Sequence, residues 1–167
     1  MDALFRLIEE SALSTWLVES ESLLAFPGVL TLHVIGMGFV AGASLVISLR
    51  FLGFFPDLPL PALAKFLPVF WIALALSAAS GLLLVVGYPT KALTNPLFYV
   101  KMAAMFLGVL ALLWLRGSIV APIGLGAASM IGVRNLALAS IALWVGTIAA
   151  GRLLAYTYTR LLVDFQG

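Results

Sequence analysis

Three basic side chains lie within long apolar segments of the sequence: His33, Lys101 and Arg152. His33 is the only histidine of the chain, and the run around it from Ser22 to Leu49 contains no charged residue. An ionisable side chain inside a membrane is costly and normally faces the interior of a helix bundle or a water-filled cavity. These three residues are therefore the candidates for a polar site.

The residues around His33 suit a flat, apolar cofactor that carries a metal ion. At about 100° per residue, Gly36 and Met37 share the helix face of His33. Gly36 lacks the side chain that would block a flat ligand from lying against this helix. We predict a haem b site in which His33 ligates the iron and Lys101 or Arg152 binds the propionates. The predicted cofactor-binding residues are His33, Gly36, Met37, Lys101 and Arg152.

Structural roles explain the same residues without a cofactor. Lys101 and Arg152 are near enough to helix ends to extend their charges to the membrane surface. A buried neutral histidine commonly bonds a serine or a backbone carbonyl. Gly38 and Gly42, on the opposite face from Gly36, have the spacing of residues that allow close helix packing.

The chain has too few metal-binding side chains for a zinc or copper site, so these are weaker interpretations than haem. A zinc or copper site usually has several histidine, cysteine or carboxylate ligands. The chain contains one histidine and no cysteine, and its apolar segments contain no carboxylate. A proton-coupled transporter usually has an acidic residue inside the membrane, and this chain offers none there.

The composition requires a membrane protein. Hydrophobic residues make up 63% of the 167 positions and charged residues 10%, and the mean hydropathy is +1.18. The lipid bilayer is thus the first partner, and a net charge of +2 gives no indication of nucleic-acid binding. A membrane span needs about 20 apolar residues. We predict an all-α fold, a single transmembrane domain over residues 1–167, with spans near 22–49, 66–87, 96–115 and 135–158.

The alternating directions of these spans place the three basic residues in one half of the membrane. His33 lies about nine residues into the first span, Lys101 about five into the third, and Arg152 about six before the end of the fourth. The first and third spans run antiparallel to the fourth. All three side chains therefore lie in the half nearer the termini, where one site could use them.

Both ends of the chain lie on the same side of such a four-helix bundle. Residues 1–21 have apolar and acidic positions typical of an amphipathic helix, which lies in the membrane interface or packs on its own bundle. Residues 117–132 are ambiguous between a loop, a re-entrant segment and a frayed helix end. Four basic residues follow spans one and three, against three on the other side, which favours termini outside the cell.

The sequence resembles two groups of membrane proteins at different distances. "LLAFPGVLTLHVIGMGFVAGASLVISLRFLGF", "NPLFYVKMAAMFLGVLALLWLR" and "WVGTIAAGRLLAY" resemble an uncharacterised family of bacterial four-helix membrane proteins, a domain of unknown function. More distantly, "LHVIGMGFVAG" with the lysine that opens span three resembles HemJ-type protoporphyrinogen oxidases and CopD-like membrane domains. The second resemblance implies b-type haem, with His33 and Lys101 as the functional pair. The HemJ-type chains carry further histidines around the third span, and this chain has none there.

These observations predict a protein of the bacterial inner membrane that binds haem b and transfers electrons, with quinone or a redox protein as its partner. A HemJ-like porphyrinogen oxidase is the second interpretation. The third is a non-catalytic accessory or assembly subunit in which His33 packs the bundle. Because one histidine cannot supply two axial ligands, the iron would be five-coordinate, take Met37, Lys101 or an exogenous ligand, or be shared between protomers. We also expect a homo-oligomer or a subunit of a larger membrane complex.

Overall fold

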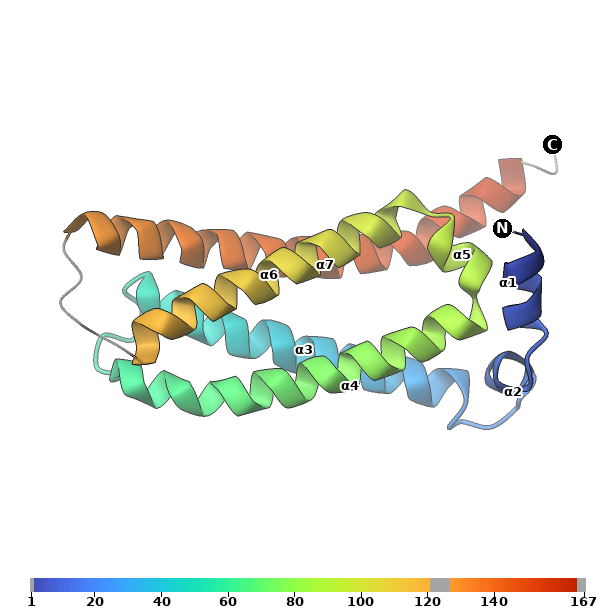
Figure 1. Ribbon diagram of the computed structural model, residues 1–167, viewed down its shortest axis with the longest axis horizontal. Coiled ribbons are helices and arrows are strands. Elements are labelled where there is room, and N and C mark those ends of the chain that lie inside the picture. Colours follow the sequence, from blue (N-terminus) through green and yellow to red (C-terminus); the bar gives the residue numbers. More distant parts are fainter. Residues whose placement is uncertain (1, 121–126, 165–167) are drawn as a thin grey trace.

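The computed structural model describes residues 2–120 and 127–164, with side chains described for residues 5–119 and 130–157. Regular structure within these ranges is entirely helical (Figure 1). In chain order the elements are α1 (Asp2–Glu9), α2 (Ala12–Glu19), α3 (Phe26–Phe51), the 3₁₀ helix η1 (Leu60–Lys65), α4 (Phe66–Gly87), α5 (Pro89–Leu93), α6 (Pro96–Val120) and α7 (Ala127–Asp164). The all-α prediction is confirmed.

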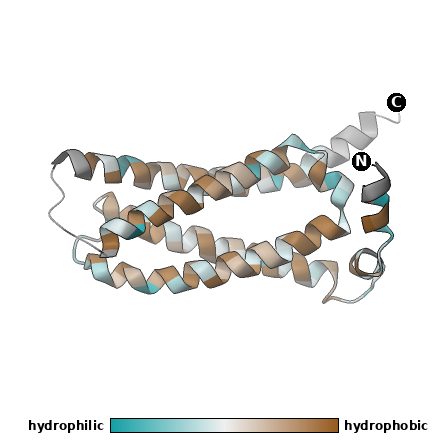
Figure 2. Cartoon of the chain, viewed as in Figure 1, coloured by the Kyte–Doolittle hydropathy of each residue, from teal (hydrophilic) through white to brown (hydrophobic). Residues whose placement is uncertain are grey.

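Four helices in the described part of the chain are long and apolar enough to cross a membrane: α3, α4, α6 and α7. Apolar residues run along these helices, as Figure 2 shows. Their outward side chains are large and apolar, and Ile72 and Trp114 are 71% and 75% exposed. Exposed side chains of this kind are stable against lipid, and helices satisfy their own backbone hydrogen bonds there. The chain is a multi-pass membrane protein.

The long helices form an antiparallel bundle (Figure 1). Helix α3 packs along α4 and α7, and α6 packs along α7. A buried hydroxyl pair connects α3 to α7, because the Oγ atoms of Ser44 and Ser140 lie 3.1 Å apart. The apolar core fills the end of the bundle where α3 connects to α4; its largest fully buried members there include Ile47, Leu63, Leu115 and Ile119.

Several helix ends differ from the predicted spans. Helix α3 begins at Phe26, four residues later than predicted, with Pro27 in its first turn. Helix α6 continues to Val120, and α7 begins at Ala127. The ambiguous segment 117–132 therefore contains the end of α6 and the start of α7, while residues 121–126 lie outside the described residues. The short helix α5 was not predicted.

The N-terminal segment forms two helices instead of one. Ser11 separates them: its Oγ donates to the Ile8 carbonyl at 2.6 Å and accepts from the Ser14 amide at 3.3 Å, which caps α2. Both helices pack on the bundle, α1 against α4 and α5 and α2 against α4. Leu17 is fully buried there, beside Gly87. The segment therefore packs on its own bundle, as one of the two alternatives predicted.

Candidate functional site

The candidate site begins with the imidazole of His33, which α3 directs toward α4. Its Nδ1 lies 2.9 Å from the carbonyl oxygen of Ser77 and 3.4 Å from the hydroxyl oxygens of Ser77 and Ser80. A carbonyl oxygen only accepts, so Nδ1 carries the ring proton and donates it to Ser77. In the neutral ring, Nε2 therefore holds a lone pair, and this atom faces α6.

Lys101 on α6 occupies the other side of the same ring. Its Nζ lies 3.2 Å from Nε2 of His33, so the ammonium group donates to the lone pair. The end of the Lys101 side chain packs against Gly151 of α7. A Cβ added at Gly151 would lie 3.7 Å from Cδ, Cε and Nζ of Lys101. Within the described side chains, His33 is the hydrogen-bond partner of Lys101, and no carboxylate forms an ion pair with it.

A glycine of α4 makes room for the imidazole. A Cβ at Gly81 would lie 3.0 Å from Cε1 and 3.3 Å from Nδ1 of His33, closer than side chains normally pack. Gly81 follows Ser77 by one helical turn, so the two residues lie on the same face of α4. Helix α4 thus supplies both the carbonyl that orients the ring and the space that the ring fills.

The glycines of α3 have roles opposite to those we predicted. A Cβ at Gly36 would lie 3.0 Å from the Ala73 carbonyl oxygen and from the Ser77 backbone nitrogen, so Gly36 permits close packing of α3 on α4. The prediction that Gly36 opens a slot for a ligand was wrong. Gly38 and Gly42 have no atom of the described residues within 4 Å of an added Cβ, so they pack against no described helix of this chain, and the prediction that they pack helices is not borne out within it.

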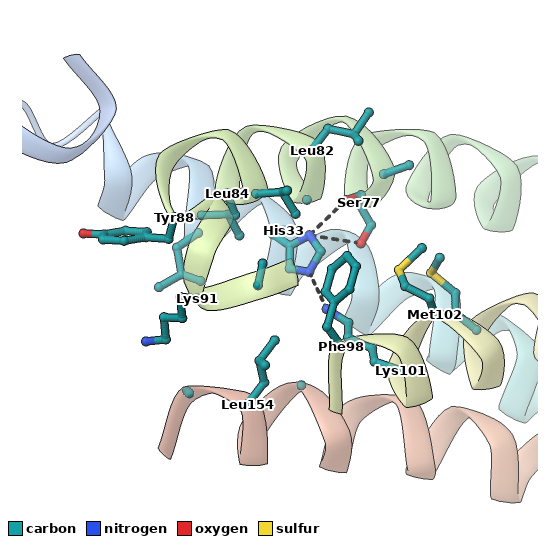
Figure 3. A pocket seen from close by; sticks show the side chains of 18 of the residues that line it. His33, Ser77, Leu82, Leu84, Tyr88, Lys91, Phe98, Lys101, Met102 and Leu154 are labelled. Carbon is teal, nitrogen blue, oxygen red and sulfur yellow. Dashed lines mark hydrogen bonds between the residues drawn. The ribbon is translucent and has the colours of Figure 1, made fainter. Parts of the chain in front are cut away.

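A cavity of about 570 Å³ extends from this ring toward α5 (Figure 3). Its volume is in the range of about 300 to 1,000 Å³ typical of small-molecule and cofactor sites. Apolar side chains of α3, α4, α6 and α7 form the walls, among them Leu30, Leu82, Phe98, Met105 and Leu154. Polar groups come from His33, Ser77, Tyr88, Lys91 and Lys101. The cavity is therefore suited to a mostly apolar ligand with a few polar or charged atoms.

Two of the five residues predicted to bind a cofactor, His33 and Lys101, line this cavity. Met37 is buried in the apolar core, and Gly36 lies in the contact between α3 and α4. Arg152 is exposed on α7 and does not line the cavity. The structure therefore separates these three residues from the imidazole and the lysine that face each other.

The sequence interpretation missed the contributions of α4 and α5. Ser77 and Gly81 are a polar and a small residue one turn apart on an apolar helix. This pattern could have predicted that their face of the helix contacts a polar group. Tyr88 and Lys91 lie in the segment "GYPTK", directly after the second predicted span. No pattern along the chain indicates that this segment folds back over the cavity.

The described residues do not form a metal site by themselves. No three histidine, cysteine, aspartate or glutamate residues within them lie close enough to hold a metal ion together. A metal at His33 would therefore need most of its ligands from another source, and a macrocycle supplies four.

The fold and the site define a class, a four-helix membrane protein with a histidine–lysine pair inside an apolar cavity. A family model described as a family of unknown function, DUF6644, matches residues 21–157, and the chain belongs to that family. The matched residues include all four spans and the cavity, which confirms the predicted membership of an uncharacterised family. No curated protein and no solved structure matches the chain. The resemblance to HemJ-type and CopD-like proteins stays a prediction.

Proposed function

We propose that the cavity binds haem b, with Nε2 of His33 as a ligand of the iron, and that the protein transfers electrons in the membrane. The observation that carries the proposal is the orientation of the imidazole. Histidines that ligate metals usually donate their second ring nitrogen to a carbonyl or carboxylate, which fixes the ring and the tautomer. His33 has this arrangement, since Nδ1 donates to the Ser77 carbonyl at 2.9 Å.

The remaining residues of the cavity fit the same cofactor. Haem would supply a single-electron redox centre, and the protein would orient it and exclude water. Phe98, Met102 and Leu154 provide apolar surface for a macrocycle. Lys101 donates to Nε2 in the structure, so iron ligation requires its ammonium group to leave that hydrogen bond. Lys101, on a different helix from His33, would then be a cationic group of the cavity close to the cofactor.

An absorption spectrum of the purified protein tests the proposal. Protein from cells supplied with haem should show a Soret band as isolated and an α band after reduction with dithionite. His33→Ala should abolish or strongly shift both bands. Met37→Leu is the matched control, because Met37 is buried in the same helix outside the cavity and the exchange nearly conserves volume. Wild-type protein without either band would contradict haem binding.

A second candidate is a non-catalytic subunit of a membrane complex. It is favoured by a specific observation: both ring nitrogens of His33 have partners within the chain, Ser77 and Lys101. In this role the imidazole connects α3 to α4 and α6. The candidate predicts that His33→Ala lowers stability in a chain that binds no chromophore.

A HemJ-like oxidase and a quinone-dependent electron carrier both fit the proposed haem site. The exposed cavity-wall residues Leu82 and Met102, 68% and 40% exposed, would let a lipid-soluble quinone or porphyrinogen approach from the bilayer. Expression in a strain lacking protoporphyrinogen oxidase separates the two activities. Restored haem synthesis would favour the oxidase, and failure by a stably expressed, haem-loaded protein would favour the carrier.

We further propose that the chain lies in the bacterial inner membrane with both termini outside. Arg50, Lys65, Arg116 and Arg134 follow spans one and three, whose ends lie at the bundle end far from α1, and loops rich in Lys and Arg are normally cytoplasmic. Alkaline phosphatase fused before α1 should be active, whereas a fusion in the loop between α3 and α4 should be inactive. The reverse result would invert the topology.

A further inference from the structure

The cavity has a second polar end, at α5. Its inner end holds the His33 and Lys101 pair, and its outer end holds Tyr88 and Lys91. In Figure 3 the polar tips of Tyr88 and Lys91 lie on the side of the cavity away from Lys101. A ligand that fills the cavity therefore meets His33 and Lys101 at its inner end and Tyr88 and Lys91 at its outer end.

The two ends are separated by a distance that suits the two functional parts of a haem. Gly81 contacts the imidazole, and α4 continues to Gly87 before α5 begins. At 1.5 Å per residue this places the start of α5 about 10 Å nearer the membrane surface than the ring. Charged groups are least costly at that surface. A haem with its iron at His33 would place its propionates most favourably at the α5 end.

The charge of the cavity also favours an anionic ligand. Among the described residues its lining contains two lysines, Lys91 and Lys101, and no aspartate or glutamate. Arg152, which we had predicted as a propionate partner, is exposed on α7 and does not line the cavity. Of the two cavity lysines, Lys101 lies at the inner end, with its Nζ 3.2 Å from Nε2 of His33. Lys91 is the cation at the end where propionates would lie.

We infer that Lys91 on α5 binds the propionate carboxylates of the cofactor and so sets its orientation, with the iron inside and the carboxylates at the membrane surface. This inference rests on the proposed haem site and adds a binding residue to it. Helix α5 is held in place for this role, since Thr90 Oγ1 donates to Glu9 Oε1 of α1 at 2.7 Å and Ala92 is buried.

The test compares haem b with haem b dimethyl ester, which has the same macrocycle and iron but no carboxylates. Apoprotein in detergent is titrated with each compound, and affinity is measured from the Soret change for wild type, Lys91→Gln, Lys91→Arg and Arg152→Gln. A charged hydrogen bond to a carboxylate changes affinity by about tenfold or more. Lys91→Gln should therefore weaken haem by about tenfold and leave the dimethyl ester unchanged.

The controls separate this inference from the haem proposal. Lys91→Arg should restore most of the preference for free carboxylates, and Arg152→Gln should match the wild type. If Lys91→Gln keeps the wild-type ratio of the two affinities, the inference is wrong while the haem site stands. If wild-type apoprotein binds neither compound, the proposed function fails, and this inference fails with it. A size-exclusion profile shows that each variant is folded.

Discussion

Each ring nitrogen of His33 has a hydrogen-bond partner, and a ligand could displace one of these partners but not the other. The Ser77 carbonyl belongs to the backbone of α4, so the hydrogen bond from Nδ1 persists as long as α3 and α4 stay packed. The partner of Nε2 is the ammonium group at the end of the flexible Lys101 side chain. A ligand can therefore replace the lysine at Nε2 without disturbing the orientation of the ring.

Lys101 should control the electronic state of a bound haem more than the amount bound. Because its Nζ lies beside Nε2, Lys101→Ala should shift the Soret or α band while the haem content per chain changes less than in His33→Ala. Spectra and haem assays of the same preparations measure both quantities. Arg152→Ala, on the exposed face of α7, should leave the spectrum unchanged. An unshifted spectrum in Lys101→Ala would place this lysine away from the iron.

Gly81 should be sensitive to the smallest side chain. The Cβ of Gly81→Ala would lie 3.0 Å from Cε1 of His33, so the ring must move by a few tenths of an ångström. We expect reduced haem content or a shifted spectrum in a protein that still folds, because the neighbouring atoms belong to a side chain. Gly42→Ala is the control, since its Cβ has no neighbour within 4 Å. Equal haem content and spectra in both variants would show that the ring tolerates the contact.

At the scale of elements, the contact between α3 and α4 fixes the site. Gly36 brings the backbone of α3 against Ala73 and Ser77, and Ser77 is also the residue whose carbonyl orients His33. Close backbone approach of this kind is how small residues pack helices in membranes. The packing contact and the site are therefore two parts of one helix interface.

Gly36→Ala should destabilise the bundle, whereas Gly38→Ala should not. The Gly36→Ala Cβ would meet backbone atoms of α4 at 3.0 Å, and overpacking of this kind costs about 1 to 3 kcal/mol of unfolding free energy. At Gly38 the added methyl meets nothing within 4 Å, and the higher helix propensity of alanine adds up to about 1 kcal/mol. Unfolding in mixed detergent measures both changes. Equal effects would contradict the assigned roles.

Helix α1 should slow ligand exchange by holding α5 at the cavity. Thr90→Val removes the hydrogen bond to Glu9, and we expect faster transfer of haem from the protein to excess apomyoglobin. A hydrogen bond to a charged group contributes about 1.5 to 3 kcal/mol, and less at an exposed position such as this one. Thr15→Val on α2, at an exposed threonine, is the control. Unchanged transfer rates in Thr90→Val would separate α1 from the cavity.

The sequence predicted which parts of the site come together better than it predicted their roles. Helix rise and alternating direction were enough to place His33 and Lys101 at one depth, and the two side chains are in contact. The same argument gave a depth for Arg152 but not its direction around the helix axis, and it is exposed. Gly36 and Gly38 were assigned by face alone, which cannot identify the neighbouring helix. Those roles depend on how the helices are arranged around one another.

At the scale of the whole molecule, hydropathy was sufficient for the fold. Apolar runs of 20 residues or more predicted four spans, and prolines and glycines placed most of their ends within a few residues. Helix α5 escaped prediction because five residues between two spans have no periodicity to detect. The cavity escaped as well, since it depends on the space left among four helices and α5.

The apolar core beyond the cavity has a consequence for the membrane itself. Ile47, Leu63, Leu115 and Ile119 are buried together between the cavity and the opposite membrane surface, and all four side chains are apolar. A packed apolar layer of this kind is a barrier to ions and protons. Vesicles containing the protein should therefore keep an imposed pH gradient as long as empty vesicles do. In electrical terms we expect the bundle to act as an insulator, so that a cofactor at His33 would exchange charge with the side on which α1, α2 and α5 lie.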